Sequence, residues 1–283
     1  MAERHAIRLL LVLPLLLLGM CRAQADEDVQ RLYVLNCGEN DTRDVSAWSP
    51  GVDGGQPRTF SDSCYLIRHG KDLLLWETGV SDAIAAMPDG LTVGNGMLTL
   101  HVRKTLRSQL QELGIAPGEI THLGFSHCHG DHVGNANLFT AAKLYIQQVE
   151  YDAAFGPDAA RSGFNPAFYN KLRDSETVKL DGDYDVFGDG SVMIYSTPGH
   201  TAGHQSLLVR LPKTGPVLLS GDAVHFRENW DNRRVPVRNF SREQSLASME
   251  KLAGILAREH ATLWINHDKP QTDTLKHAPE YFE

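Results

Sequence analysis

The chain has 283 residues, of which 42% are hydrophobic and 22% are charged, and its formal net charge is −8. This length is sufficient for one large α/β domain with a complete hydrophobic core. The acidic balance and the lack of a basic stripe argue against a protein that binds nucleic acid.

Residues 1–25 have the features of a secretory signal peptide. Arg4 and Arg8 provide a positive start, a leucine-rich run covers 9–18, and Ala23-Gln24-Ala25 has the small-residue pattern of a cleavage site. The apolar run is too short to span a bilayer comfortably. We therefore expect a periplasmic or secreted domain of residues 26–283 without stable membrane insertion. Cleavage would remove three arginines and one glutamate, which changes the net charge from −8 to −10.

Hydrophobic patterns predict strands and helices along the mature chain. The predicted strands cover 31–36, 63–68, 72–77, 121–125, 143–146, 177–180, 192–196, 205–211, 216–220 and 262–265, and a long loop covers 38–60. Helices are predicted near 102–114, 147–155, 166–174 and 241–258. The last has the best start signal, because Ser241 can cap it and Gln244 follows three residues later. The strands form two groups, each with helices, which suggests two sheets packed face to face with helices outside.

The segment His127-Cys128-His129-Gly130-Asp131-His132 follows the predicted strand 121–125. Residues two apart in an extended segment point the same way, so His127 and His129 can bind one cation. Asp131 and His132 follow at a turn and can face a neighbouring cation. Imidazoles with a carboxylate suit Zn²⁺ and also admit Mn, Fe or Co. The alternative is a set of scattered surface histidines, but four ligand-type residues within six positions favour a metal site.

Three further ligand-type residues lie at the ends of later strands. His200 follows a Pro-Gly turn after strand 192–196, Asp222 follows strand 216–220, and His267 follows strand 262–265. Each alone is more often a turn residue, but loops at strand ends are where ligands are commonly found. Together the sequence offers five histidines and two aspartates, a set suited to two metal ions bridged by one carboxylate.

Three cysteines remain after the predicted cleavage. Cys37 ends one predicted strand and Cys64 begins another, so they either form a disulfide between antiparallel neighbours or remain as two buried thiols. Cys128 lies between two predicted ligands, so its side chain should point into the core. Cys21 leaves a lipid anchor as an alternative to simple cleavage, although Met20 before it is large for a lipoprotein signal.

Two stretches read as insertions, residues 79–101 and residues 155–176. The first is rich in Gly, Met and Ala, and the second contains Phe155, Phe164 and Tyr169 among its aromatic residues. They are either ordinary surface loops or walls of an apolar pocket over the metals, and we favour the second interpretation.

The segments 127–132, 197–204, 220–223 and 266–268 resemble the metallo-β-lactamase superfamily, and the resemblance runs over nearly the whole mature chain. It implies an α/β fold of the αββα type, a single-domain sandwich with the metals at the shared edge of its sheets. It implies two Zn²⁺ ions, or other divalent transition metals. Position by position, it implies that His127, His129 and His200 bind the first ion, that Asp131, His132 and His267 bind the second, and that Asp222 bridges them.

Within the superfamily, the run 198–207 most resembles the N-acyl-homoserine lactone lactonases, and the pattern near 222–229 adds weaker support. This implies a small-molecule lactone as substrate, with Asp131 passing a proton to the leaving oxygen. Many of these lactonases carry Tyr three residues after the bridging aspartate, where this chain has His225. The imidazole N–H of His225 can donate the same hydrogen bond to the lactone carbonyl. His204 either orients a ligand or is a buried structural histidine.

Three other functions compete with a lactonase. A periplasmic metallo-β-lactamase usually carries Cys or Ser where this chain has Asp222. A glyoxalase-II-like thioesterase shares all seven ligands, but the leader, the long N-terminal loop and the lack of a basic glutathione-binding tail argue against it. A secreted zinc-binding module would need a closed structural site, whereas a bridging carboxylate with open coordination favours a hydrolase.

Overall fold

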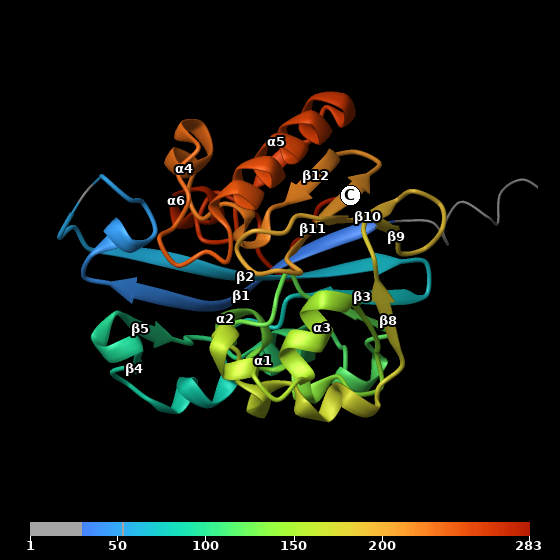
Figure 1. Ribbon diagram of the computed structural model, residues 1–283. Helices are drawn as coiled ribbons and strands as arrows, with labels where there is room; N and C mark the ends of the chain where they lie inside the picture. The colour runs from blue at the N-terminus through green and yellow to red at the C-terminus, as the bar shows by residue number, and fades with distance from the viewer. Residues whose placement is uncertain (1–29, 53) are drawn as a thin grey trace, which may run out of the picture.

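The structure, a computed structural model, describes residues 30–52 and 54–283; the predicted signal peptide and its cleavage site lie outside them. Two sheets lie face to face, with helices over the outer face of each (Figure 1). The predicted αββα sandwich is confirmed. Across the described residues, none of the helices combines the length and the apolar composition needed to cross a membrane.

The first sheet has eight strands in the order β4-β5-β1-β2-β3-β6-β7-β8, and the second has five in the order β13-β12-β11-β10-β9. The strands of the first sheet are β1 (Arg31–Thr42), β2 (Arg58–His69), β3 (Asp72–Trp76), β4 (Leu91–Val93), β5 (Leu98–His101), β6 (His122–Gly124), β7 (Lys143–Gln147) and β8 (Thr177–Leu180). Those of the second are β9 (Tyr184–Asp185), β10 (Val192–Ser196), β11 (Gln205–Leu211), β12 (Gly215–Leu219) and β13 (Thr262–Trp264).

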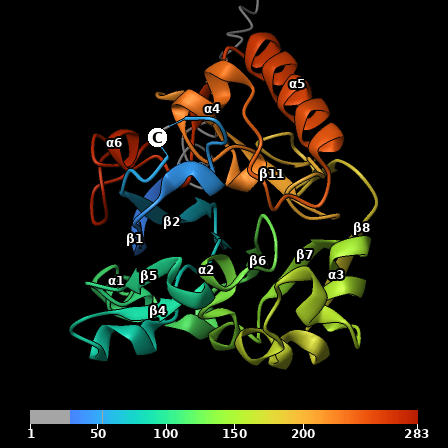
Figure 2. The same cartoon turned by 60° about the vertical axis from the view of Figure 1, so that its left-hand side comes forward.

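The α-helices are α1 (Leu106–Glu112), α2 (Gly130–Val133), α3 (Gln148–Phe155), α4 (Arg227–Asn232), α5 (Arg242–Glu259) and α6 (Lys269–Thr272). Short 3₁₀ helices are η1 (Val45–Ala47), η2 (Asp82–Ala86), η3 (Gly94–Gly96), η4 (Pro117–Glu119), η5 (Ala136–Leu138), η6 (Ala159–Ser162), η7 (Pro166–Phe168), η8 (Asn170–Asp174) and η9 (Gly221–Ala223). Figure 2 shows the two layers from the side, with β1 and β2 between α4, α5 and α6 on one side and α1 and α2 on the other.

Both faces of the first sheet are buried, and successive side chains of its central strands alternate between the two faces. Leu32 and Val34 of β1 pack between the sheets, whereas Tyr33 and Leu35 pack against the outer helices. This is why β1 begins with an unbroken apolar run, since neighbouring residues of a strand point to opposite faces. The outer face of the second sheet packs on the apolar side of α5. Ser241 caps that helix by accepting from the backbone N–H of Gln244 at 3.2 Å, as predicted.

The strands β1 and β2 are longer than the sequence predicts. Both have 12 residues, so the predicted loop 38–60 shrinks to 43–57. The extra strand residues include Asn40 and Asp62, which are 0% and 1% exposed. They carry no hydrophobic signal because they face a polar site. The β4–β5 hairpin within 79–101 was missed as well, and the predicted helix 166–174 is two 3₁₀ helices.

Candidate metal centre

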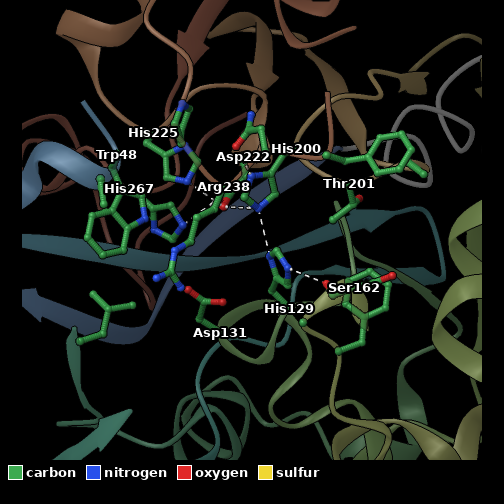
Figure 3. Close-up of a pocket in the computed structure, with 18 of the residues that line it drawn as sticks. Trp48, His129, Asp131, Ser162, His200, Thr201, Asp222, His225, Arg238 and His267 are labelled. Atoms are coloured by element: carbon green, nitrogen blue, oxygen red, sulfur yellow. Dashed lines mark hydrogen bonds and ion pairs between the residues drawn. The ribbon is translucent and has the colours of Figure 1, made fainter. Parts of the chain in front are cut away.

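The ends of four strands bring every predicted ligand into one cluster. Figure 3 shows five of these ligands, namely His129, Asp131, His200, Asp222 and His267. The segment after β6 carries His127 and His129 and leads into α2, which contains Asp131 and His132. The other three follow strands of the second sheet: His200 after β10, Asp222 in η9 after β12, and His267 after β13. The cluster therefore lies where loops from both sheets meet.

The first group consists of His127, His129 and His200. Its inner nitrogens are close: Nδ1 of His129 lies 2.8 Å from Nε2 of His127 and 3.0 Å from Nε2 of His200. Each outer nitrogen has a polar partner, namely Ser126 Oγ at 2.9 Å for His127, Ser162 O at 3.2 Å for His129 and Asn239 Oδ1 at 3.0 Å for His200. The carbonyl and amide oxygens can only accept, so they hold the ring proton outside and leave a lone pair pointing inward.

The second group consists of Asp131, His132 and His267, whose ligand atoms lie within 4.8 Å of one another. Here carboxylates stand behind the rings. Nδ1 of His267 lies 3.1 Å from Asp62 Oδ1, and Nδ1 of His132 lies 3.3 Å from Glu77 Oε2. Asp131 is held through its Oδ2, which accepts from the Asn40 amide at 3.0 Å.

Asp222 stands between the two groups and turns one carboxylate oxygen to each. Its Oδ2 lies 3.2 Å from His200 Nε2, and its Oδ1 lies 3.3 Å from His132 Nε2 and 3.0 Å from His267 Nε2. Oδ1 and His132 Nε2 are buried and have no hydrogen-bond partner among the described residues. A cation bound between these atoms would satisfy both. The residues thus fit a pair of divalent ions with a bridging carboxylate.

His204 supports Asp222 from behind. Its Nε2 accepts from the backbone N–H of Asp222 at 2.9 Å, and its Nδ1 lies 2.9 Å from Thr197 Oγ1. Burial lowers the pKa of His204 to about 3, so the ring is neutral and Nε2 is free to accept. Gly221 beside Asp222 has φ +51°, and a Cβ there would lie 2.4 Å from Ser126 Cβ. Features of both predicted roles are present, because the ring of His204 is buried and it also holds the backbone of the candidate ligand Asp222.

The two groups differ in protonation. Burial lowers the pKa of His127 and of His200 well below the ordinary value, which keeps both rings neutral. Burial also opposes protonation of His132 and His267, but Asp222 with Glu77 or Asp62 outweighs it and raises their pKa well above the usual value. Burial likewise opposes ionisation of Asp222, yet the surrounding histidines hold its pKa well below the usual range. A divalent cation can replace ring protons opposite a carboxylate, with release of those protons.

His225 lies within the cluster. It is 2% exposed, and its Nε2 is 3.1 Å from Asp222 Oδ2, on the side of the first group. With His200 and Asp222 it forms a further set of ligand atoms within 4.8 Å of one another. The structure thus brings the two residues predicted to act on substrate, Asp131 and His225, to the same pocket.

Sequence reasoning missed the residues behind the ligands. The most buried examples are Asn40, Asp62, Glu77 and Glu150. Glu150 of α3 accepts from the backbone N–H of Cys128 at 3.0 Å and from that of Gly203 at 3.0 Å, which joins two ligand-bearing loops. Burial raises the pKa of Glu150 to about 7. The sequence offers no motif for them, because Asn40 and Glu150 lie among other polar residues and Glu77 follows the end of β3.

A cavity of about 830 Å³ opens over the cluster. Met97 and Leu98 from the stretch 79–101, and Ala160 and Phe164 from the stretch 155–176, line it together with Trp48 and Phe60. The prediction that both stretches form pocket walls is confirmed for these residues. Tyr169, in contrast, packs in the core and donates from its hydroxyl to Ala154 O at 3.0 Å.

The cysteines follow the predicted alternatives. Cys37 and Cys64 form a disulfide between the antiparallel strands β1 and β2, with an S–S distance of 2.01 Å. Cys128 is a buried free thiol in the core on the outer side of the first sheet, as predicted.

Comparison with known proteins places these features in context. Residues 58–258 match the model of the Metallo-beta-lactamase superfamily. The chain is 34% identical over 263 residues to an N-acyl homoserine lactonase AttM of Azorhizobium caulinodans. This match covers 89% of this chain and 98% of that relative. It is 31% identical to an N-acyl homoserine lactonase of a Bacillus species, over 89% of this chain and 99% of the relative.

A solved structure agrees with these relatives. It is an N-acyl homoserine lactone hydrolase with the product N-hexanoyl-L-homoserine bound at its catalytic metal centre. That structure superposes on this one with a TM-score of 0.78 at 27% identity, and covers 90% of this chain and 99% of its own.

Proposed function

The chain belongs to the metallo-beta-lactamase superfamily, and from this premise we propose that it opens the lactone ring of N-acyl-homoserine lactones with two divalent ions, Zn²⁺ being the expected metal. The observation that carries the proposal is the division of Asp222 between two groups of ligand-type residues. The proposal is also supported by two N-acyl homoserine lactonases that match this chain over nearly their whole length.

The proposed ligands are those that converge on Asp222. His127, His129 and His200 would hold one ion, Asp131, His132 and His267 would hold the other, and Asp222 would bridge them. When bound, the ions supply an activated water and polarise the carbonyl of the substrate. The overall reaction adds one water across the ring ester and yields an N-acyl-homoserine.

Asp131 is the proposed proton donor to the leaving oxygen. It lines the pocket, and the Asn40 amide donates to its Oδ2 at 3.0 Å, which holds the carboxylate at the edge of the cluster. Cleavage of the ring ester leaves an alkoxide that must gain a proton. A carboxyl group at the edge of the cluster can carry a proton from the attacking water to that oxygen.

His225 is the proposed hydrogen-bond donor to the lactone carbonyl. His225 lines the pocket, and its Nε2 lies 3.1 Å from Asp222 Oδ2. A ring nitrogen in this setting can donate to the oxygen that becomes negative during attack. Such a donor acts mainly on the transition state, because the charge develops there.

A substrate panel tests the function. Purified mature protein would be given N-acyl-homoserine lactones, a simple lactone, a β-lactam and a glutathione thioester, with acid release followed by a pH indicator. We expect turnover of the acyl-homoserine lactones, and a product heavier by one water that recloses in acid. Release of free homoserine lactone would show that the amide is cut instead, and turnover of the β-lactam or the thioester alone would favour the other two hydrolase classes.

We also propose that the domain is exported and begins at Asp26. The buried Cys37–Cys64 disulfide supports this, because structural disulfides persist mainly in oxidising compartments. N-terminal sequencing of the protein from a periplasmic or secreted fraction should begin at Asp26. Protein that keeps Met1 and remains in the cytoplasm would contradict export.

A further inference from the structure

The disulfide between Cys37 and Cys64 lies at an irregularity of the sheet. Asn36 of β1 pairs with Ser63 of β2, but Glu39 pairs with Ser61. Cys37 and Gly38 therefore stand together opposite one residue, Asp62, and form a bulge. Bulges re-aim the side chains that follow them. Both cysteines are buried, 2% and 0% exposed, so the bond fixes the bulge from inside the protein.

The residues around this bulge support two of the proposed ligands. Just beyond it, the Asn40 amide donates to Asp62 Oδ1 at 3.2 Å and to Asp131 Oδ2 at 3.0 Å. Asp62 Oδ1 lies 3.1 Å from Nδ1 of His267. Gly38 has φ +148°, and a Cβ there would lie 2.6 Å from Val80 Cγ2 and 3.1 Å from Asp62 Oδ2. The bulge is thus closely packed against the carboxylate that holds His267.

A second path leads from the disulfide to α2. The carbonyl of Cys37 accepts from Val80 N at 3.0 Å, and Gly79 lies so close that a Cβ there would be 2.2 Å from Cys37 Cβ. The carbonyl of Gly79 accepts from Gly134 N at 2.8 Å, at the end of α2. Thr78 N donates to the carbonyl of His132 at 2.7 Å. The segment 78–80 therefore connects Cys37 to the helix that carries Asp131 and His132.

The first group of ligands is supported by other elements. The outer nitrogens of His127, His129 and His200 contact Ser126, Ser162 and Asn239, and none of these three contacts involves β1 or the bulge. The disulfide is therefore linked to Asp131, His132 and His267 through the bulge and the segment 78–80. Its links to the first group run through Asp222 and through Ser126, whose Oγ lies 2.9 Å from Nδ1 of His127 and 3.3 Å from Nδ1 of His132.

We propose that the Cys37–Cys64 disulfide is a positioning element for the metal position formed by Asp131, His132 and His267. Reducing it would loosen the bulge and weaken binding of that ion, while the ion at His127, His129 and His200 stays bound. This inference rests on the proposed two-metal function. The reductant is a phosphine, which with one water converts the disulfide into two thiols and becomes the phosphine oxide.

The test uses the mature protein loaded with Co²⁺, whose visible spectrum reports each ligand environment. Metal affinity and stoichiometry are measured on the oxidised protein, on protein reduced with a phosphine and desalted, and on the Cys37→Ala/Cys64→Ala variant. The same phosphine treatment of the double variant is the control for direct effects of the reductant. His267→Ala and His129→Ala provide reference spectra for loss of the second and of the first position, and circular dichroism reports the fold.

We expect one free thiol in the oxidised protein and three after reduction. Reduced protein and the double variant should bind one ion as before and the other at least about 10-fold more weakly, the low end of what loss of an outer partner of a metal ligand costs. Their spectrum should match that of His267→Ala. Because the readout is metal binding, failure to hydrolyse lactones would count against the proposed function alone.

Several outcomes would overturn the proposal. Three thiols before reduction would show that the bond does not form. Unchanged affinities with an intact fold would limit the disulfide to general stability, and simultaneous loss of both ions or of the fold would show that it supports the whole domain. If oxidised protein binds only one ion, the two-metal premise itself is wrong.

Discussion

The two halves of the candidate metal centre share one carboxylate, but only one half has further carboxylates behind its histidines. Behind His127, His129 and His200 stand neutral acceptors, a hydroxyl, a carbonyl and an amide. Behind His132 and His267 stand the carboxylates of Glu77 and Asp62 in addition to neutral oxygens, Ser126 Oγ and Ser61 O. A carboxylate behind an imidazole makes it a more basic ligand. The comparison shows that residue types alone, here histidines in both halves, do not determine how a site binds metal.

The largest effect is expected from substitution of Asp222, the residue that both halves share. Asp222→Ala should release most of the metal from both positions and lower kcat/KM by more than about 10³-fold, beyond the usual cost of one oxyanion donor. Elemental analysis and kinetics measure both effects. The exposed Asp231→Ala variant on α4 is the control and should keep both ions. Full metal content in Asp222→Ala would show that the halves are independent.

Glu150 ties together the loops of the first half, and its burial predicts a pH-dependent stability. Burial raises its pKa to about 7 in the fold, above the ordinary value of 4.5 for a glutamate. The protonated form is therefore favoured in the fold, and stability is lost as pH rises from about 4.5 to about 7. The shift corresponds to about 3 kcal/mol. Unfolding of metal-depleted protein at several pH values measures the slope.

Glu150→Gln should remove this contribution to the pH dependence of the free energy of unfolding, whether the variant itself is more or less stable. The exposed Glu243→Gln variant at the start of α5 should leave the slope unchanged. A slope in Glu150→Gln equal to that of the unmodified protein would show that Glu150 is ionised in the fold throughout this range.

A pair of substitutions sharpens the contrast between the halves. Asp62→Asn removes the charge behind His267, and Asn239→Ala removes the acceptor behind His200. Each substitution should lower the binding affinity for one ion by about 10- to 100-fold and leave the affinity for the other ion unchanged. Co²⁺ spectra should change in complementary ways, since the two variants act on different ions. Identical spectral changes would mean that the halves respond as one unit.

Substitution of His225 separates an effect on catalysis from an effect on metal binding. His225→Ala should lower kcat by about 10- to 100-fold with metal content unchanged, because a donor to the developing oxyanion is lost while the metal can compensate in part. His225→Tyr should retain substantial activity, because a phenol hydroxyl can also donate. Loss of an ion in His225→Ala would instead identify it as a ligand, and an unchanged kcat would leave it as a packing neighbour.

Much of the fold follows from local patterns. The strands β10 and β11 have the predicted bounds, because each contains a run of apolar residues with turn residues beyond its ends. Strands β1 and β2 extend beyond the prediction, because Asn40 and Asp62 are polar and face the centre. The β4–β5 hairpin was missed because its strands have three and four residues, too short for a clear alternation.

The sequence by itself identified the candidate ligands His127, His129, Asp131 and His132, because their spacing fits the geometry of a strand that runs into a helix. Only the tertiary structure decided what stands behind each ligand. Asn40 lies 91 residues from Asp131, and Ser61 lies 206 residues from His267, so no local pattern connects them. Local patterns also left undecided whether Cys37 and Cys64 form a disulfide. The structure decides this, because β1 and β2 are antiparallel neighbours. The periodicity of a chain records which face of an element is buried, whereas partners across sheets depend on packing and register.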